Sequence, residues 1–258
     1  MLNYKVNGDI NGEVIIFVNG AGLGPWMWKN QIEYFNNYKC ITFDLPGHGE
    51  NNDNIFTTIK DCSKSINEIV SKESFGQKSI IIGHSIGAQV VLEMLSSYPN
   101  LFKKGIVISV LNKAMPIVKK LVSPMIKLSM PLVKLKSFAK LQAKQFNLPD
   151  EMFNLYFSDS LKMSEHTLIN ILNENMSFSF DAKNKTSVDT LLLVGAKEKK
   201  VMHESIHNTI KNLKSARGYI VKHAGHGIPY EKSELFNKVA LKFLEGKKIE
   251  EEGLIAIK

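Results

Sequence analysis

The chain has 258 residues, of which 44% are hydrophobic and 22% charged, and its formal net charge is +8. This composition is typical of a globular protein with a substantial core, and it excludes disordered and fibrous chains. Because Cys40 and Cys62 lie far apart and lack metal-binding spacing, we expect neither a disulfide framework nor a zinc site.

Short apolar, β-branched runs alternate with longer amphipathic segments along most of the chain. Such runs are typical of parallel strands buried on both faces, and the amphipathic segments of crossover helices. The pattern predicts an α/β fold with a doubly wound, mostly parallel sheet of about eight strands. The expected strands are 2–6, 13–18, 39–44, 79–82, 105–110, 191–194 and 219–222, and the expected helices are 59–71, 88–97, 202–213 and 233–245.

The alternation stops between residues 112 and 180, where four prolines interrupt a helical sequence rich in Leu, Met and Lys. Since proline removes an amide donor and clashes with the preceding turn, we expect short or kinked helices there. We interpret 112–180 as a helical cap inserted into a core formed by 1–111 and 181–245. The C-terminal tail, 246–258, has a charged run and few apolar anchors, and we assign it no role.

The apolar run 79–82 leads directly into Gly83-His84-Ser85-Ile86-Gly87, and a helical pattern follows. A sharp turn from strand to helix forces the serine into a strained conformation and requires glycine on both sides. Such a turn lifts Ser85 into a cleft, at a helix N-terminus whose amides favour negative charge. The alternative is that Ser85 is an ordinary helix cap. Its context favours a catalytic nucleophile.

Four motifs, in this order, resemble the α/β-hydrolase family. They are Asn-Gly-Ala-Gly at 19–22, Asp-Leu-Pro-Gly-His-Gly at 44–49, the serine turn at 83–87, and Ala-Gly-His-Gly-Ile-Pro at 224–229. The resemblance covers nearly the whole chain except the cap. It implies a serine hydrolase that needs no cofactor or metal. One departure is Asn19, where the family usually has His.

A serine nucleophile needs an imidazole to accept its proton and a carboxylate to orient that imidazole. His226 lies in a glycine-flanked loop after the strand at 219–222, in the place that resembles that of the catalytic histidine in α/β-hydrolases. Glu198 follows the strand at 191–194, at its carboxyl end, where similar hydrolases usually carry Asp. Glu198 also has lysines on either side in the sequence, so the alternative is that it belongs to a solvated cluster of charged side chains. The alternatives for this role are Asp159, Asp181 and Glu204, whereas Asp189 precedes its strand and would emerge at the wrong end of the sheet.

By the resemblance, the backbone N–H groups of Ala21 and Ile86 form the oxyanion hole. We expect Gly20, Trp26, Met115 and Phe153 to contact the substrate, although aromatic and Met side chains at such places often only pack the core. The apolar cap residues favour a small, hydrophobic acyl compound.

The excess of positive charge lies in one segment, because residues 94–149 contain ten Lys and no Asp or Glu. Two interpretations are open: a solvated helical face, or a patch that attracts anionic lipid or an acidic substrate. Arg217 is the single arginine and nucleic-acid motifs are missing from the sequence, so we expect no nucleic-acid partner. The first residues lack a basic start followed by an apolar stretch, and no apolar run reaches membrane-spanning length. We therefore expect a cytoplasmic protein.

These observations predict hydrolysis of a carboxylic ester, thioester or lactone through an acyl-enzyme. The same triad also serves carbon–carbon bond hydrolases and acyltransferases, because one fold supports many chemistries. The alternative to an enzyme is a non-catalytic ligand-binding or membrane-surface protein with the same fold.

Overall fold

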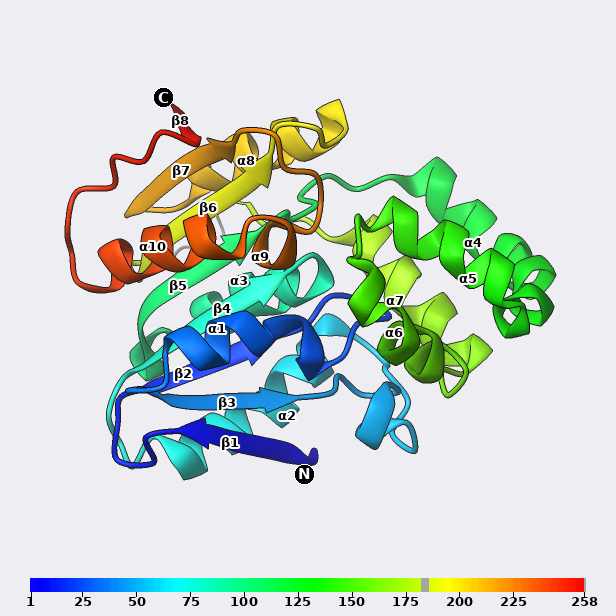
Figure 1. Cartoon of the computed structure of the whole chain (residues 1–258), viewed down its shortest axis with the longest axis horizontal. Helices are drawn as coiled ribbons and strands as arrows, with labels where there is room; N and C mark the ends of the chain where they lie inside the picture. The colour runs from blue at the N-terminus through cyan, green and yellow to red at the C-terminus, as the bar shows by residue number, and fades with distance from the viewer. Residues whose placement is uncertain (182–185, 258) are drawn as a thin grey trace.

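The computed structural model describes residues 1–181 and 186–257, and its centre is one sheet of eight strands (Figure 1). The inner strands are parallel to one another, and the two outermost strands are antiparallel to their neighbours. The fold class is thus as the sequence predicts. The strands are β1 (Tyr4–Gly8), β2 (Val14–Val18), β3 (Lys39–Phe43), β4 (Ser79–His84), β5 (Phe102–Ile108), β6 (Asp189–Gly195), β7 (Ala216–Val221) and β8 (Leu254–Ile257), in the spatial order β1-β3-β2-β4-β5-β6-β7-β8.

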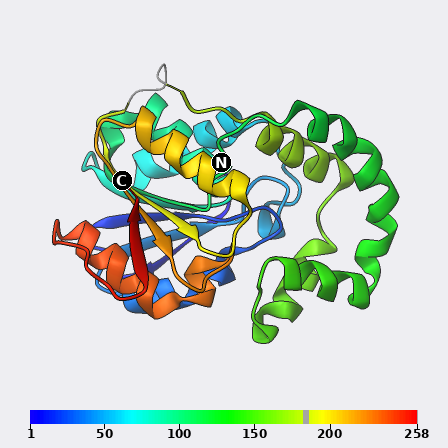
Figure 2. The same ribbon diagram turned by 90° about the horizontal axis from the view of Figure 1, so that it is seen from above.

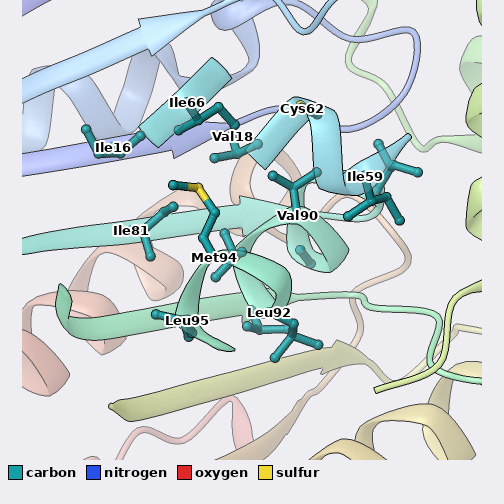
Figure 3. Packing of buried hydrophobic residues seen from close by; sticks show 14 of the residues in the cluster. Ile16, Val18, Ile59, Cys62, Ile66, Ile81, Val90, Leu92, Met94 and Leu95 are labelled. Atoms are coloured by element: carbon teal, nitrogen blue, oxygen red, sulfur yellow. The ribbon is translucent and has the colours of Figure 1, made fainter. Parts of the chain in front are cut away.

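Two layers of helices cover the sheet, and each buries an apolar cluster against one face. In one cluster, drawn in Figure 3, Ile66 and Val90 pack against Ile16 and Ile81 of the strands. In the other, Phe236 is among the residues that meet the opposite face. The first layer contains α2 (Ile59–Glu73), α3 (Ile86–Ser97) and α8 (Lys200–Asn212), and the second contains α1 (Lys29–Tyr34), α9 (Ile228–Glu231) and α10 (Ser233–Leu244).

The C-terminal tail takes part in the sheet, in contrast to the sequence analysis, which gave it no role. Strand β8 pairs antiparallel with β7 and covers the edge that β7 would otherwise expose. Leu254 and Ile257 pack against the two core clusters from this edge. The sequence signal was weak because the strand has only four residues and follows a charged run.

Between β5 and β6 the chain leaves the sheet and forms a group of helices at one end of the core (Figure 2). We call residues 112–180 the cap. Pro116 is the first residue of a helix, Pro131 lies in a 3-10 turn, and Pro149 precedes another turn. Of these four prolines, only Pro124 lies in the interior of an α-helix. No helix in the described part of the chain is long and apolar enough to cross a membrane. The cap contains α4 (Pro116–Ser129), η4 (Met130–Lys134), α5 (Lys136–Gln145), η5 (Asp150–Met152), α6 (Phe153–Ser160) and α7 (Glu165–Ser177).

We predict that deletion of residues 252–258 lowers the stability of the fold, because β7 would lose its hydrogen-bonded neighbour and two apolar contacts. A loss of about 1–3 kcal/mol would lower the melting temperature by roughly 2–10 °C in a chain of this size. Thermal unfolding measures this shift. The variant Ile255→Ser, on the exposed side of the same strand, is the control, and an unchanged melting temperature after deletion would contradict the structural role of β8.

Candidate active site

Ser85 stands at the turn between β4 and α3, with φ +57° and ψ −118°. Few non-glycine residues adopt a positive φ, so the surrounding chain must hold it there. Glycine is required on both sides: a Cβ on Gly83 would lie 2.3 Å from the Gly87 carbonyl oxygen, and one on Gly87 would lie 2.4 Å from the Val18 carbonyl oxygen. The close packing of β2, β4 and α3 therefore places the half-buried Ser85 at the carboxyl end of the sheet.

His226 and Glu198 form the pair expected beside such a serine. The imidazole Nδ1 of His226 lies 2.8 Å from Oε2 of Glu198, whose side chain is only 3% exposed. Both residues lie in loops that follow parallel strands, His226 after β7 and Glu198 after β6. Nδ1–H donates to the carboxylate, which leaves Nε2 as the ring atom available to accept a proton.

Ser109 supports Glu198 and was missed by the sequence analysis. Its hydroxyl donates a 2.7 Å hydrogen bond to Oε1 of Glu198, and the amide of Gly195 donates to the same oxygen at 2.9 Å. Ser109 follows β5 with a positive φ of 55°. With His226, these groups give the buried carboxylate three donors, which is how a buried charge is stabilised. The separation of 89 residues between the two side chains gave no local signal.

Glu231 fixes the loop that carries His226 and was also missed. Its carboxylate accepts hydrogen bonds from the amide of Gly225 at 3.0 Å and the amide of Gly227 at 2.8 Å, on either side of the imidazole. Asn147 of the cap donates to Oε1 of Glu231 at 3.0 Å. One carboxylate therefore links the backbone around His226 to the cap.

His84 lies beneath His226, with the two ring centroids 4.8 Å apart. Nε2–H of His84 donates to the backbone carbonyl of His226 at 2.7 Å. Burial, with a smaller contribution from the neighbouring His226, lowers the pKa of His84 to about 3, so the ring stays neutral. Gly20 packs against this ring, since a Cβ there would lie 2.8 Å from Nδ1. His84 thus supports the backbone that carries His226.

Ala21 follows β2, and Ile86 is the first residue of α3, directly after Ser85; an oxyanion hole formed by their backbone N–H groups stays a prediction. Ala21 borders the same cavity as Ser85. The loop of Ala21 is held by His48, whose Nε2 accepts from the amide of Gly22 at 3.0 Å while Nδ1–H donates to Pro46 at 3.1 Å. Burial lowers the pKa of His48 to about 4, which keeps Nε2 an acceptor.

Asn19 stands where the family usually has His, and two hydrogen bonds hold its side chain. Its Nδ2 donates to the Phe43 carbonyl at 2.8 Å, and its Oδ1 accepts from the Trp28 indole at 2.9 Å. Asn19 is fully buried, so both contacts are protected from water. They anchor the start of the loop that contains Ala21.

A cavity of about 570 Å³ lies between the core and the cap, and Ser85 and His226 both border it. Among the four residues predicted to contact substrate, Met115 lines this cavity, and Gly20, Trp26 and Phe153 are outside the lining. The Trp26 indole instead donates to Asp159 of the cap at 2.8 Å, and Phe153 stacks on Phe157. The lining is mainly apolar and comes mostly from the cap, including Val118, Ile126, Met130, Val133, Leu168, Leu172 and Met176.

The alternative carboxylates are engaged elsewhere. Asp189 pairs with Arg217 at 2.7 Å, Glu204 pairs with Lys113 at 2.8 Å, and Asp159 binds Trp26. Asp181 is exposed at the end of the cap. Of the five carboxylates considered, the structure brings only Glu198 to His226 within its described residues.

Comparison with known proteins bears on the family and the fold of the chain. Residues 15–239 match the model of the alpha/beta hydrolase family. A pimeloyl-[acyl-carrier protein] methyl ester esterase of Wigglesworthia glossinidia brevipalpis is 36% identical over 105 residues, which cover 40% of this chain and 37% of that protein. The chain therefore spans little more than a third of that relative's length.

Two further matches extend over most of the chain. A 2-hydroxy-6-oxo-6-(2'-aminophenyl)hexa-2,4-dienoic acid hydrolase of Metapseudomonas resinovorans is 23% identical over 251 residues, 90% of this chain and 84% of that protein. The structure of MenH from S. aureus superposes with a TM-score of 0.78 at 21% identity, covering 95% of this chain and 99% of that one. At this identity the superposition establishes the shared fold.

We predict that Ser109→Ala lowers kcat about tenfold and leaves the fold intact, because Glu198 loses one donor and holds His226 less firmly. One hydrogen bond to a charged group contributes about 1.5 kcal/mol, which corresponds to roughly that factor in rate. Turnover of a chromogenic ester measures the effect. The control is Ser205→Ala, which removes another buried hydroxyl that bonds only within its own helix. Equal rates for the two variants would contradict a positioning role for Ser109.

The two buried histidines predict acid sensitivity. Folded His48 and His84 have pKa values of about 4 and 3, whereas an unfolded histidine titrates near ~6.5. Between that value and the folded pKa values, the unfolded chain binds more protons than the folded chain, so the free energy of unfolding falls as the pH falls through this window. Within the window, each histidine lowers the free energy of unfolding by about 1.4 kcal/mol per pH unit.

Urea unfolding at neutral pH and near pH 5 tests this expectation. His48→Gln should reduce the loss of stability between the two conditions, and His207→Gln, on an exposed helix position, should not. An unchanged pH dependence in His48→Gln would contradict the assignment.

Proposed function

Because the chain belongs to the alpha/beta hydrolase family, we propose that it is a serine hydrolase that cleaves an ester-like bond through an acyl-enzyme. The observation that carries this proposal is the convergence of Ser85 and the His226–Glu198 pair on one cavity. The three side chains come from separate loops at the carboxyl end of the sheet. That arrangement suits a nucleophile, a base and an orienting acid.

In the proposed reaction, Nε2 of His226 accepts the proton of the Ser85 hydroxyl as Oγ attacks the substrate carbonyl. The carbonyl oxygen becomes an oxyanion, which the amides of Ala21 and Ile86 stabilise. The imidazolium then gives its proton to the leaving alcohol or thiol, and the acyl group stays on Oγ. Water repeats the sequence: His226 takes a proton from it, hydroxide adds to the acyl carbon, and the acid leaves as Ser85 regains its hydrogen.

Glu198 stabilises the imidazolium throughout these steps and keeps its own charge. Three donors surround it, so it holds a fixed position and needs no water. The longer Glu side chain reaches His226 from the loop after β6, in the place where similar hydrolases usually carry Asp. The departure noted in the sequence thus leaves the orienting contact in place.

The cavity supports a small hydrophobic acyl compound as the substrate. Apolar cap side chains form most of the lining, and Ser85, Ser109 and His226 border the cavity from the core. Such a division suits a substrate with an apolar tail and one reactive carbonyl. The names of two relatives, a methyl ester esterase and a dienoic acid hydrolase, are consistent with hydrolysis of a carbonyl compound.

We predict that a fluorophosphonate probe labels the wild-type chain and does not label Ser85→Ala, because only an activated serine attacks the probe. The matched control is Ser160→Ala, whose side chain borders the same cavity and binds the Phe157 carbonyl. Loss of kcat in Ser85→Ala should exceed about a thousandfold. A series of nitrophenyl esters with lengthening acyl chains then measures the preference of the cavity.

Two outcomes would overturn this proposal. Labelling that persists in Ser85→Ala would place the reactive serine elsewhere. A wild-type chain that resists the probe and still binds apolar carbonyl compounds would favour the non-catalytic ligand-binding alternative.

A further inference from the structure

The outward side of helix α4 carries a stripe of exposed apolar residues. Ile117, Leu121, Met125 and Leu128 follow one another at intervals of four, four and three residues, which places them on one face of a helix. Ile117 is 79% exposed and Leu128 is 81% exposed. Large aliphatic side chains gathered in this way are uncommon on the surface of a protein that acts alone in water.

Two lysines border this stripe, and they lack acidic partners. Lys120 and Lys127 lie along one edge of it on the helix and are exposed, whereas Lys119 lies on the other side of α4. Neither Lys120 nor Lys127 forms an ion pair with any residue that the structure describes. Three lysines before α4 in the same basic segment do form ion pairs: Lys103 with Glu13, Lys104 with Asp189 and Lys113 with Glu204.

The opposite side of α4 faces the cavity. Val118, Ile126 and the following Met130 line it, so the helix has an apolar surface on both sides. Figures 1 and 2 show α4 at the end of the molecule remote from the sheet, where the core does not cover its outer side. The stripe is therefore not needed to close the cavity or to pack the core.

We propose that the outer face of α4, meaning Ile117, Leu121, Met125 and Leu128 with Lys120 and Lys127, docks on an anionic lipid bilayer. The aliphatic side chains enter the boundary between headgroups and acyl chains, and the lysines remain at the level of the lipid phosphates. This is the arrangement of an amphipathic helix that lies in the plane of a membrane surface.

Charge and shape favour this occupant over the alternatives. A second copy of the chain would bring a second set of unpaired lysines against the first, with like charges opposed. A soluble acidic protein would need a surface shaped to the stripe, and α4 offers a convex helix side. A fluid bilayer accepts isolated aliphatic side chains without matching shape, and its anionic headgroups complement the lysines.

The proposal does not depend on the hydrolytic activity. Docking through α4 would place a wall of the cavity next to the lipid layer, from which apolar compounds partition. Ser85 and His226 lie on the far side of that wall and are not part of the docking face. Membrane binding and ester turnover can therefore be measured, and can fail, separately.

Co-sedimentation of the full chain with vesicles tests the proposal. We expect binding to phosphatidylcholine vesicles that contain one-third phosphatidylglycerol, little binding to pure phosphatidylcholine, and weakening as salt is raised to about 300 mM. The combined variant Lys120→Glu, Lys127→Glu should lose at least about tenfold in partitioning, since each lysine near an anionic surface contributes roughly fivefold. The combined variant Ile117→Ser, Leu121→Ser, Leu128→Ser should also bind less. In particular, it should lose the fraction of vesicle binding that remains at high salt.

Matched controls separate the face from overall charge and hydrophobicity. Lys60→Glu, Lys211→Glu makes the same change in charge on exposed helix positions of the core. Ile10→Ser, Ile55→Ser, Phe75→Ser removes equally exposed apolar groups elsewhere. Both controls should bind as the wild type does, and all variants should keep turnover of a soluble ester.

Failure to bind anionic vesicles even at low salt would overturn the proposal. So would equal losses in the α4 variants and the controls, because the effect would then reflect net charge or hydrophobicity alone. A dimer in solution that dissociates in the Ile117, Leu121, Leu128 variant would assign the face to a second copy instead.

Discussion

The close approach of backbone at the turn after β4 is the constraint on which the site depends. Gly83 and Gly87 let α3 start within contact distance of the end of β2, and this contact holds Ser85 at a φ that its side chain would otherwise avoid. The same contact sets the N-terminus of α3 beside the loop of Ala21. The proposed nucleophile and the proposed oxyanion donors are thus positioned by one packing arrangement, and any side chain on either glycine would disturb both.

Local patterns in the sequence predicted the features that arise locally. The buried strands are near-continuous runs of Ile, Val and Leu, and the serine turn requires its glycines at fixed positions, so both are visible without a structure. Glu198 was predicted because parallel strands bring their carboxyl ends to one edge, and the structure joins it to His226. Ser109 and Glu231 escaped prediction because their function comes from hydrogen bonds that only the folded chain forms. Strand β8 escaped because a short edge strand carries little periodicity.

Prediction of the cavity wall was less successful for a similar reason. Met115 lines the cavity, whereas Trp26 binds Asp159 of the cap and Phe153 stacks on Phe157 within α6. Composition indicated that the cap is rich in Leu, Met and Lys, but the side of a helix that faces the cavity depends on how the cap helices pack together. In α4 both sides are apolar, so periodicity alone does not distinguish the side that encloses the cavity from the side that meets the surroundings.

The hydrogen bond between Asn147 and Glu231 has a consequence for the cap as a whole. Glu231 also holds the amides on both sides of His226, so the seat of the cap and the alignment of the imidazole share one carboxylate. A movement of the cap that broke the Asn147 hydrogen bond would therefore remove one of the contacts that hold Glu231 beside His226. If cap position and imidazole alignment were coupled in this way, the coupling would be reciprocal, and a ligand that stabilised one would stabilise the other by the same free energy.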